Sequence, residues 1–400
     1  MTDGPLVTIV TPSLNQGRFI GEAVESVLGQ TYPAIEYVVL DAGSTDETHD
    51  VLRKFGSRVQ WKVESDNGQS QAINRGWRRG AGTILAWLCA DDLLEPNAVA
   101  TAVEALLARP DAGAAYGRGT NFTDTEIEPQ DHTAPFHLWR LINMFDFVFQ
   151  PAAFFRRDAV EAVGWLDESL HYSMDWDLLI RLGLRQPLVP VDALLARARI
   201  HVGAKTSTGG LRRHRELRRV IRRYADERRP PSYWFYGLET FKHAADAMAD
   251  KLSRRSPRIG RSARDLVDRA NTSVACRTFL KADDWWPDGW ACASVDFLVP
   301  PGDEPVRLVG AIAPDLAPQT LSVAVDGSER CREVLPAGPF SITVPGTTGG
   351  TRDVTRVRVT ADRWKPIHHP WGRDAIRRVA YRLDAIERRS AAQSPTEGRS

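Results

Sequence analysis

Residues 87–96 read Trp-Leu-Cys-Ala-Asp-Asp-Leu-Leu-Glu-Pro, and the chain is organised around this stretch. An apolar segment, residues 83–88, runs directly into two adjacent carboxylates, Asp91 and Asp92, and Pro96 signals a helix that follows. Two neighbouring negative charges need either water or a cation around them. We therefore expect a polar site at the end of a buried strand.

Strand-like and helix-like segments alternate around this stretch. The predicted strands are residues 7–11, which Pro12 is expected to end, 37–40, 59–63 and 84–88. The predicted helices are residues 19–28, a short helix through Leu52 that the hydroxyls of Ser44 and Thr45 can cap, and residues 71–79. This alternation predicts an α/β fold whose mostly parallel sheet is covered by helices on both faces. Ligands of such sheets bind beyond the carboxyl ends of the strands, so Asp41 should converge with Asp91 and Asp92 on one crevice.

The composition is that of a globular chain with two or three domains. The 400 residues carry a net charge of +1, so nucleic acid is not the expected partner. Four cysteines stand far apart without a Cys-x-x-Cys pair, which fits reduced thiols in the cytoplasm. No apolar run reaches the length of a membrane span, about 18 residues, and the N-terminus lacks the features of a signal peptide. We expect a cytoplasmic protein.

The loop after the first strand argues against two common nucleotide sites. It reads Pro12-Ser13-Leu14-Asn15-Gln16-Gly17, without G-x-G-x-x-G, and the chain has no P-loop motif, so neither an NAD or FAD site nor a P-loop site is expected. A diphosphate bound without a glycine cradle needs another positive charge, and Mg²⁺ or Mn²⁺, which prefer oxygen ligands, can supply it. Taken alone, Asp91-Asp92 could be the solvated first turn of a helix. Its place at a strand end, like that of Asp41, favours the metal.

Four motifs in order along the chain resemble the family 2 glycosyltransferases of GT-A fold, over roughly Leu6 to Thr206. They are Val7-Thr8-Ile9-Val10-Thr11-Pro12-Ser13-Leu14-Asn15, Asp41-Ala42-Gly43-Ser44-Thr45-Asp46-Glu47-Thr48, Asp66-Asn67-Gly68-Gln69-Ser70-Gln71-Ala72-Ile73-Asn74-Arg75-Gly76 and Ala90-Asp91-Asp92.

The resemblance implies an inverting transfer of a sugar from a nucleotide diphosphate, most often UDP, to a hydroxyl. The acceptor would be a glycan or a lipid-linked molecule, as in polysaccharide or cell-envelope biosynthesis. It implies that Asp92 binds Mn²⁺ or Mg²⁺ while Asp91 faces the nucleotide, and that Asp41 takes the uracil imide proton. Ala90 stands where many members carry an Asp, which would leave the metal a single Asp ligand. The donor-binding residues that it implies are Thr11, Pro12, Asn15, Asp41, Ser44, Asp66, Gln69 and Asp91.

A second cluster, residues 171–181, carries the predicted catalytic base. Ser173 can cap a helix whose first turn holds Asp175, which is also the pattern of an ordinary capped helix. The resemblance implies that Asp175 is the base, with Met174 where the family has Glu. An alcohol attacks well only as its proton is removed, and a positioned base contributes roughly 10² to 10⁴ in rate. Gln150 would lie near the acceptor, and Trp176 is a second candidate for that contact.

A third cluster, residues 198–206, follows an apolar strand. A histidine in this position is often structural, but the resemblance implies that His201 binds the metal or the diphosphate. It further implies that Lys205 clamps the diphosphate. Between Asp91-Asp92 and the second cluster, the polar residues 123–135 are expected to form a loop, and Phe147, Phe149, Phe154 and Phe155 are expected to be core.

The rest of the chain changes in texture. Residues 211–229 predict an arginine-rich amphipathic helix that either packs on the catalytic domain or contacts an anionic membrane surface. From Thr272 onward, short alternating strands predict an antiparallel β-sandwich-like accessory domain, whose tryptophans are expected mostly in packing, although they could stack on sugars. The predicted domains are the GT-A domain 1–210, a basic helical linker 211–271, the β domain 272–389 and a disordered tail 390–400.

Two rival functions stay open at this level. A sugar-phosphate nucleotidyltransferase shares the sheet and the acidic site but normally carries a glycine-rich first loop with Arg and Lys. A non-catalytic carbohydrate-binding or assembly protein would fit the replacements at Ala90 and Met174.

Overall fold

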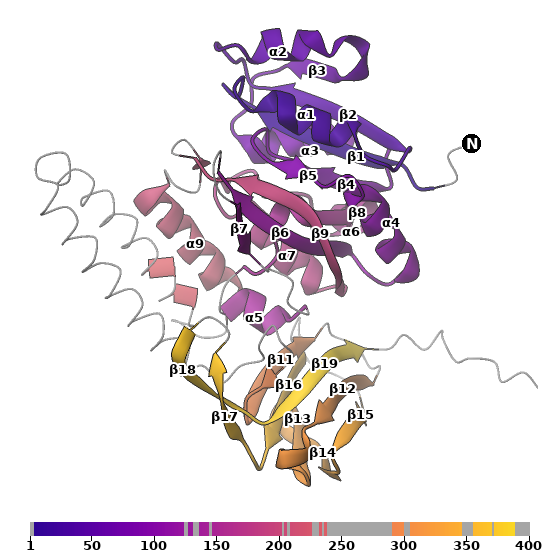
Figure 1. Cartoon of the computed structure of the whole chain (residues 1–400), viewed down its shortest axis with the longest axis vertical. Helices are drawn as coiled ribbons and strands as arrows, with labels where there is room; N and C mark the ends of the chain where they lie inside the picture. The colour runs from indigo at the N-terminus through magenta and orange to yellow at the C-terminus, as the bar shows by residue number, and fades with distance from the viewer. Residues whose placement is uncertain are drawn as a thin grey trace, which may run out of the picture. The chain divides into compact units, whose positions relative to one another are not determined.

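The computed structural model describes residues 4–123, 127–130, 136–143, 146–201, 204–205, 209–225, 232–233, 236–237, 290–299, 305–345, 355–369 and 372–388. They belong to two compact units (Figure 1). Unit 1 comprises Met1–Phe136 and Asp146–Asp226, and unit 2 comprises His137–Phe145 and Glu227–Ser400. The predicted boundaries at 210 and 271 stay predictions. The predicted tail and most of the predicted linker lie outside the described residues.

A mixed sheet forms the centre of unit 1. Its strands are β1 (Val7–Ser13), β2 (Ile35–Asp41), β3 (Gln60–Val63), β4 (Ile84–Trp87), β5 (Leu93–Leu94), β6 (Ala114–Phe122), β7 (Ile127–Gln130), β8 (Ala153–Arg156) and β9 (Leu188–Arg199). Their order is β3-β2-β1-β4-β8-β6-β9-β5, with β7 paired to β6. The first four strands are parallel, as are β6 and β9, whereas β8, β5 and β7 pair antiparallel. The predicted GT-A fold is confirmed.

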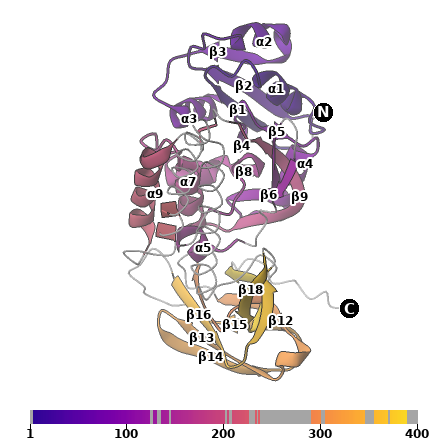
Figure 2. The ribbon, with the colours of Figure 1, turned by 60° about the vertical axis from the view of Figure 1, so that its left-hand side comes forward.

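Helices cover both faces of this sheet, as predicted (Figure 2). They are α1 (Ile20–Leu28), α2 (Thr48–Lys54), α3 (Gln69–Arg79), α4 (Ala98–Ala108), α6 (Arg157–Val163), α7 (Met174–Gly183) and α9 (Gly210–Tyr224). Val7 and Ile9 of β1 share a core with α1 and α4. The alternate residue Val10 faces α3, where a Cβ on Gly76 would lie 2.6 Å from its side chain. Glycine at this position therefore allows α3 to approach the sheet closely.

Three local predictions were wrong. Pro12 does not end β1, because it lies beyond the β1–β4 pairing, where only β2 flanks the strand and a missing N–H is tolerated. The Ser44 and Thr45 hydroxyls do not cap α2, since both bond within the loops before it. Part of the predicted loop 123–135 forms β7, and the short strand β5 stands between Asp92 and α4.

Unit 2 is an antiparallel β structure with its own core. One sheet has the order β10-β19-β12-β15 and the other β11-β16-β13-β14, and their inner faces share one apolar cluster. The strands are β10 (Trp290–Ala291), β11 (Ser294–Val299), β12 (Val306–Ile312), β13 (Gln319–Val325), β14 (Ser328–Leu335), β15 (Gly338–Val344), β16 (Thr355–Ala361) and β19 (Tyr381–Arg388), with β17 (Lys365–His369) and β18 (Gly372–Val379) as a separate hairpin. The predicted sandwich-like domain is confirmed. Helix α5 (Leu138–Asn143) also belongs to this unit.

Two further predictions concern apolar residues. The four phenylalanines of residues 147–155 are buried, as predicted. Among the tryptophans considered for sugar stacking, Trp290 is half-buried and Trp364 exposed, while Trp285, Trp286 and Trp371 lie outside the described residues. In the part of the chain that the structure describes, no helix combines the length and apolarity needed to cross a membrane.

Candidate functional site

A fully buried carboxylate lies at the carboxyl end of β2. Asp41 has no exposed side-chain surface, and its Oδ2 accepts hydrogen bonds from the Gly43 and Ser44 amides at 3.0 and 2.8 Å and from His49 Nε2 at 2.7 Å. The Ser44 hydroxyl donates to Oδ1 at 2.5 Å. Burial raises the pKa of Asp41, but the bonds from Ser44, His49 and Gly43 outweigh it and leave that pKa below the ordinary value. Asp41 is therefore held as an anion.

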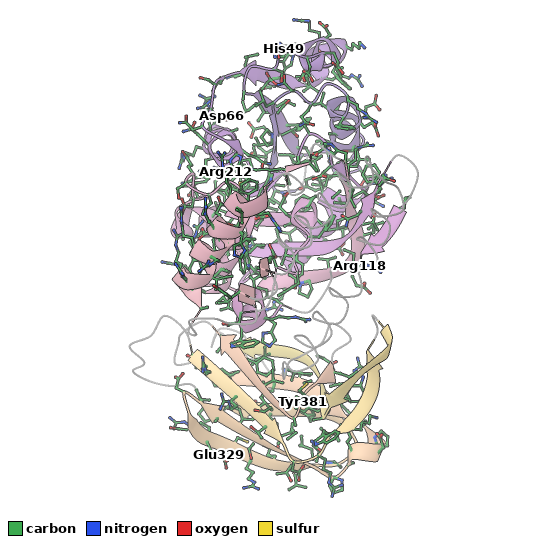
Figure 3. All side chains as sticks on the ribbon, turned by 90° about the vertical axis from the view of Figure 1, so that its left-hand side faces the viewer. His49, Asp66, Arg118, Arg212, Glu329 and Tyr381 are labelled. Carbon is green, nitrogen blue, oxygen red and sulfur yellow. The ribbon has the colours of Figure 1, made fainter. Side chains whose placement is uncertain are left out.

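The loops after β1 and β2 are locked together around Asp41. The Asn15 amide donates to Ser44 Oγ at 2.7 Å, and Asn15 Oδ1 accepts from the Thr45 amide at 2.8 Å. His49, on α2, stacks on Trp61 with ring centroids 5.3 Å apart, and 23% of its side chain is exposed (Figure 3). The accessible surface beside Asp41 is thus an imidazole and an indole.

An acidic cluster follows β4. One oxygen of Asp91, one of Asp92 and Cys89 Sγ all lie within 4.8 Å of one another. Asp92 is only 7% exposed and accepts the Arg199 amide at 3.2 Å. Burial, and then the charge of Asp91, raises the pKa of Asp92 well above its usual range. A divalent cation would offset this crowded negative charge, so the donor set fits Mg²⁺ or Mn²⁺.

The end of β9 places His201 beside this cluster. Arg199 donates through Nη2 to Glu22 at 2.8 Å, and its guanidinium lies 4.4 Å from the ring centroid of Phe122. Two residues on, His201 Nε2 lies 2.9 Å from Asp91 Oδ2. His201 therefore contacts the Asp91 member of the acidic cluster. The cluster itself consists of Cys89, Asp91 and Asp92.

A polar chain leads from the acidic cluster towards α7. Gln69 Nε2 donates to Cys89 Sγ at 3.1 Å, and Lys205 Nζ donates to Gln69 Oε1 at 2.8 Å. Burial lowers the pKa of Lys205, while the carboxylates Asp175 and Glu216 act in the opposite direction. Lys205 is thus linked to the cluster through Gln69, and its positive charge interacts with the charge of Asp175.

Asp175 lies in the first turn of α7 and is itself a carboxyl in an apolar setting. Its Oδ1 accepts the Trp176 amide at 2.8 Å. Burial raises the pKa of Asp175, and the Trp176 amide and the charge of Lys205 only partly offset this effect. Burial and then the charge of Asp175 raise the pKa of Asp146 more strongly. The two carboxyls differ in acidity, and a carboxylate with a raised pKa is a stronger base than an ordinary one.

The first part of the chain is similar to known glycosyltransferases. Residues 8–164 match the model described as glycosyl transferase family 2. This stretch belongs to that family. An uncharacterized glycosyltransferase of Rickettsia typhi is 27% identical over 221 residues, which cover 52% of this chain and 68% of the relative. Another from Mycobacterium tuberculosis is 29% identical over 251 residues, covering 61% and 91%.

Two solved structures are similar to this chain at low sequence identity. S. aureus TarS 1–349 in complex with UDP-GlcNAc is 16% identical with a TM-score of 0.46, covering 62% of this chain and 73% of that one. The mannosyltransferase PcManGT from Pyrobaculum calidifontis in complex with GDP-Man and Mn²⁺ is 18% identical with a TM-score of 0.44, covering 69% and 87%.

Some of the residues predicted for the site are in contact with one another. Asn15, Ser44 and Asp41 are joined by hydrogen bonds, as are Asp91 and His201, and Gln69 and Lys205. Thr11 is buried and bonds to Tyr37 at 3.0 Å, Pro12 is half-buried beside it, and Asp66 accepts the Gly68 amide at 2.8 Å. Gln150 donates to the Trp87 carbonyl at 3.1 Å, next to Cys89.

Three expectations about these glycosyltransferase residues are not supported. Trp176 is 2% exposed and forms core, so it offers no surface to an acceptor. Asp41 already accepts four hydrogen bonds and has no exposed surface to receive an imide proton. Ser173 precedes α7, but its hydroxyl donates to Glu216 at 3.0 Å and does not cap the helix.

Several residues of the site were missed from the sequence. His49 and Trp61 come from separate elements, and Asp146 and Glu216 lie far along the chain from the motifs. Cys89 could have been found, because it stands two residues before Asp91 in the opening stretch.

Proposed function

We propose that unit 1 transfers a sugar from a nucleotide-diphosphate donor, with UDP favoured, to a hydroxyl of a glycan or lipid-linked acceptor, with inversion at the anomeric carbon. The family match supports glycosyl transfer. The observation that carries the proposal is the polar chain Cys89–Gln69–Lys205, which connects the acidic cluster to the charge of Asp175. This chain of contacts supports a site that combines a cation-binding centre with a base of raised pKa.

The two ends of the site would hold different parts of the donor. Asn15, Ser44 and Asp41 would shape the nucleoside end, with Pro12, Asp66 and Asp91 as further donor contacts and His49 and Trp61 beside them. Thr11 is fully buried, so it would support this end without touching the donor. Asp92 and His201 would hold Mn²⁺ or Mg²⁺. Asp91 and Cys89, which lie beside them, would be further ligands. When bound, such an ion neutralises negative charge that develops on a diphosphate leaving group. Lys205 would add a fixed positive charge on the Asp175 side.

Asp175 would act on the acceptor. Its carboxylate accepts the hydroxyl proton while the acceptor oxygen forms a bond to C1 of the sugar. The bond from C1 to the diphosphate oxygen breaks, and its electron pair leaves with the nucleotide diphosphate. Attack opposite to the departing group inverts the anomeric configuration. Protein surroundings that raise the pKa of Asp175 strengthen it as the base for this step.

A donor screen tests the proposal directly. Thermal unfolding is measured with UDP-, GDP- and dTDP-sugars, with and without Mn²⁺, because a donor that binds the folded state stabilises it. The stabilising donor is then assayed for nucleotide diphosphate release with candidate glycan acceptors, and the product's anomeric configuration is read by NMR. We expect release that depends on the divalent ion, with an inverted product. Retention of configuration would refute the inverting mechanism.

The same assay distinguishes the alternatives. Binding of glycan without release from any nucleotide sugar would favour a non-catalytic carbohydrate-binding protein. Release of pyrophosphate from a nucleoside triphosphate and a sugar phosphate would favour a nucleotidyltransferase. The cytoplasmic location stays a prediction.

We also propose that α9 contacts an anionic membrane surface. Leu217, Val220 and Ile221 are buried, and the opposite side exposes an arginine stripe of Arg212, Arg215, Arg219 and Arg222. Basic side chains near an anionic bilayer contribute about 1 kcal/mol each. Sedimentation with phosphatidylserine vesicles should therefore be reduced by replacing the four arginines with Gln. No sedimentation of the wild-type protein would remove the membrane contact.

A further inference from the structure

The N-terminus of α7 is bound by a carboxylate from a different helix. The amide of His171 donates to Glu216 Oε2 at 2.9 Å, and the amides of Tyr172 and Ser173 donate to Oε1 at 2.5 and 2.8 Å. The Ser173 hydroxyl donates to the same oxygen at 3.0 Å. Four donors from three consecutive residues therefore converge on one side chain.

Glu216 binds the N-cap residue Ser173 and the two residues before it, just ahead of α7. A negative charge at this end of a helix is also stabilised by the helix dipole. The Ser173 side chain makes no capping hydrogen bond to α7. Glu216 is 43 to 45 residues away along the chain, as the separations of the four hydrogen bonds show. The conformation of residues 171–173 thus depends on α9.

Helix α9 is held against α7 at a second point. Asp177, one turn into α7 and fully buried, accepts Arg223 Nη1 at 2.8 Å and the Tyr224 hydroxyl at 2.7 Å. Near the start of α9, a Cβ on Gly209 would lie 2.8 Å from the Tyr172 ring. Helix α9 is therefore hydrogen-bonded to α7 near its C-terminus and lies close to Tyr172 at its start, with Glu216 between these two points.

The segment that Glu216 holds lies between groups assigned to the reaction. Asp175 follows Ser173 by two residues in the first turn of α7. Lys205 Nζ lies 5.9 Å from the centroid of Tyr172, and a Cβ on Gly68 would lie 3.2 Å from His171 Nδ1. Displacement of residues 171–173 would therefore change the place of the carboxyl relative to Lys205.

We infer that Glu216 is a positioning residue for Asp175, which it places by binding the amides of residues 171–173. This inference rests on the proposed function for the role of Asp175 and on the hydrogen bonds for the contact itself. Glu216 acts through the α7 terminus and touches neither sugar nor acceptor. Loss of these contacts should lower kcat more than it raises KM for the donor, because the nucleoside end is built from other elements.

The pH profile separates positioning from simple fastening of α9. The charged groups that act on Asp175 are Lys205 and Arg213, together with the carboxyl of Asp146, and burial is the main reason that its pKa is raised. If the first turn of α7 loosens, Asp175 gains water and its pKa falls towards the ordinary value. The acidic limb of kcat should then move to lower pH. A role limited to stability would lower the melting temperature without moving that limb.

The experiment compares Glu216→Ala and Glu216→Gln with wild type. The Gln variant keeps an oxygen for Tyr172 and Ser173 but loses the charge and the acceptor of the His171 amide. Glu104→Gln, on the exposed side of α4, is the matched control. Hydrogen–deuterium exchange of the peptide covering residues 171–177 is measured on each full-length protein, together with kcat, donor KM and the pH profile for the donor that the screen selects.

We expect faster exchange at residues 171–173 and a lower kcat in Glu216→Ala, a smaller change in Glu216→Gln and none in Glu104→Gln. Unchanged exchange at residues 171–173 in Glu216→Ala would overturn the inference. Faster exchange with an unchanged kcat and pH profile of the folded enzyme would also overturn it. If wild type turned over no donor, the proposed function would fail, while the exchange result would still decide whether Glu216 holds this segment.

Discussion

Asp41, which is fully buried, and Asp175, which is half-buried, lie at opposite ends of the proposed site and have opposite electrostatic environments. Asp41 accepts four donors, and its pKa is lowered despite complete burial. Asp175 accepts one amide of its own helix, and burial raises its pKa. The number of donors, and not burial alone, separates the two. The first carboxylate is a permanent structural anion, and the second is suited to take and release a proton.

Replacing Asp175 should produce the largest effect on turnover. Asp175→Asn removes the proton acceptor, so kcat should fall by roughly 10² to 10⁴, the usual contribution of a positioned base. Stability should be unchanged or higher, because the fold disfavours the ionised form of this carboxyl. Nucleotide diphosphate release and thermal unfolding are measured together, with the exposed Asp192→Asn as control. Wild-type turnover in Asp175→Asn would assign the base elsewhere.

Replacing Asp41 should instead affect stability. In Asp41→Asn, an amide nitrogen at the Oδ2 position would face the Gly43 and Ser44 amides, and the partner of His49 loses its charge. We expect a loss of about 3 kcal/mol, at the upper end of the cost of leaving a buried polar group unsatisfied. Denaturant unfolding measures this loss. The control is Asp50→Asn, which changes an exposed residue next to His49 on α2. If Asp41→Asn were as stable as wild type, the negative charge of Asp41 would not be needed to bind its four hydrogen-bond donors.

Replacing Asp146 should have the smallest effect on turnover, and it tests the surroundings of Asp175. Burial and the charge of Asp175 raise the pKa of Asp146 well above its usual range, so the neutral form of this carboxyl is favoured. Asp146→Asn replaces that neutral form with a neutral group of similar shape, and kcat should stay close to wild type. Steady-state assays across pH measure this. A large shift in the acidic limb would show that Asp146 is ionised in the active enzyme.

The same comparison explains what could be predicted from sequence. The Asp41 end is built from two loops that follow neighbouring strands, and its residues lie in short continuous motifs. Strand ends at Asp41 and Asp91 therefore predicted a shared edge of the sheet. The base end depends on α7 and α9, whose contact through Glu216 spans more than forty residues, and no local pattern specifies it.

Met174 is a second position whose role could not be predicted from the sequence. Its place where the family has Glu would leave the predicted base, Asp175, with one fewer neighbouring carboxylate. In the structure, its side chain is buried, and its sulfur accepts the Ser70 hydroxyl at 2.7 Å, so the position is part of the core. A single substitution in a motif could be seen in the sequence, but its packing partner on α3 could not.

The most direct test of the central claim is the pH dependence of kcat measured alongside the native state. The stabilising contribution of Asp41 is present above its unfolded pKa, about 3.9, and is lost only as pH falls through its lower folded pKa. Asp175, with its raised pKa, is protonated at a higher pH. Nucleotide diphosphate release at saturating Mn²⁺ and tryptophan fluorescence are therefore recorded in the same buffers, for wild type and for Asp175→Asn.

The account predicts that wild-type kcat falls as pH is lowered, with a midpoint above the ordinary Asp pKa, while fluorescence stays native, and that the residual rate of Asp175→Asn lacks this limb. A wild-type rate that falls only together with the native fluorescence would contradict the assignment of Asp175 as the base.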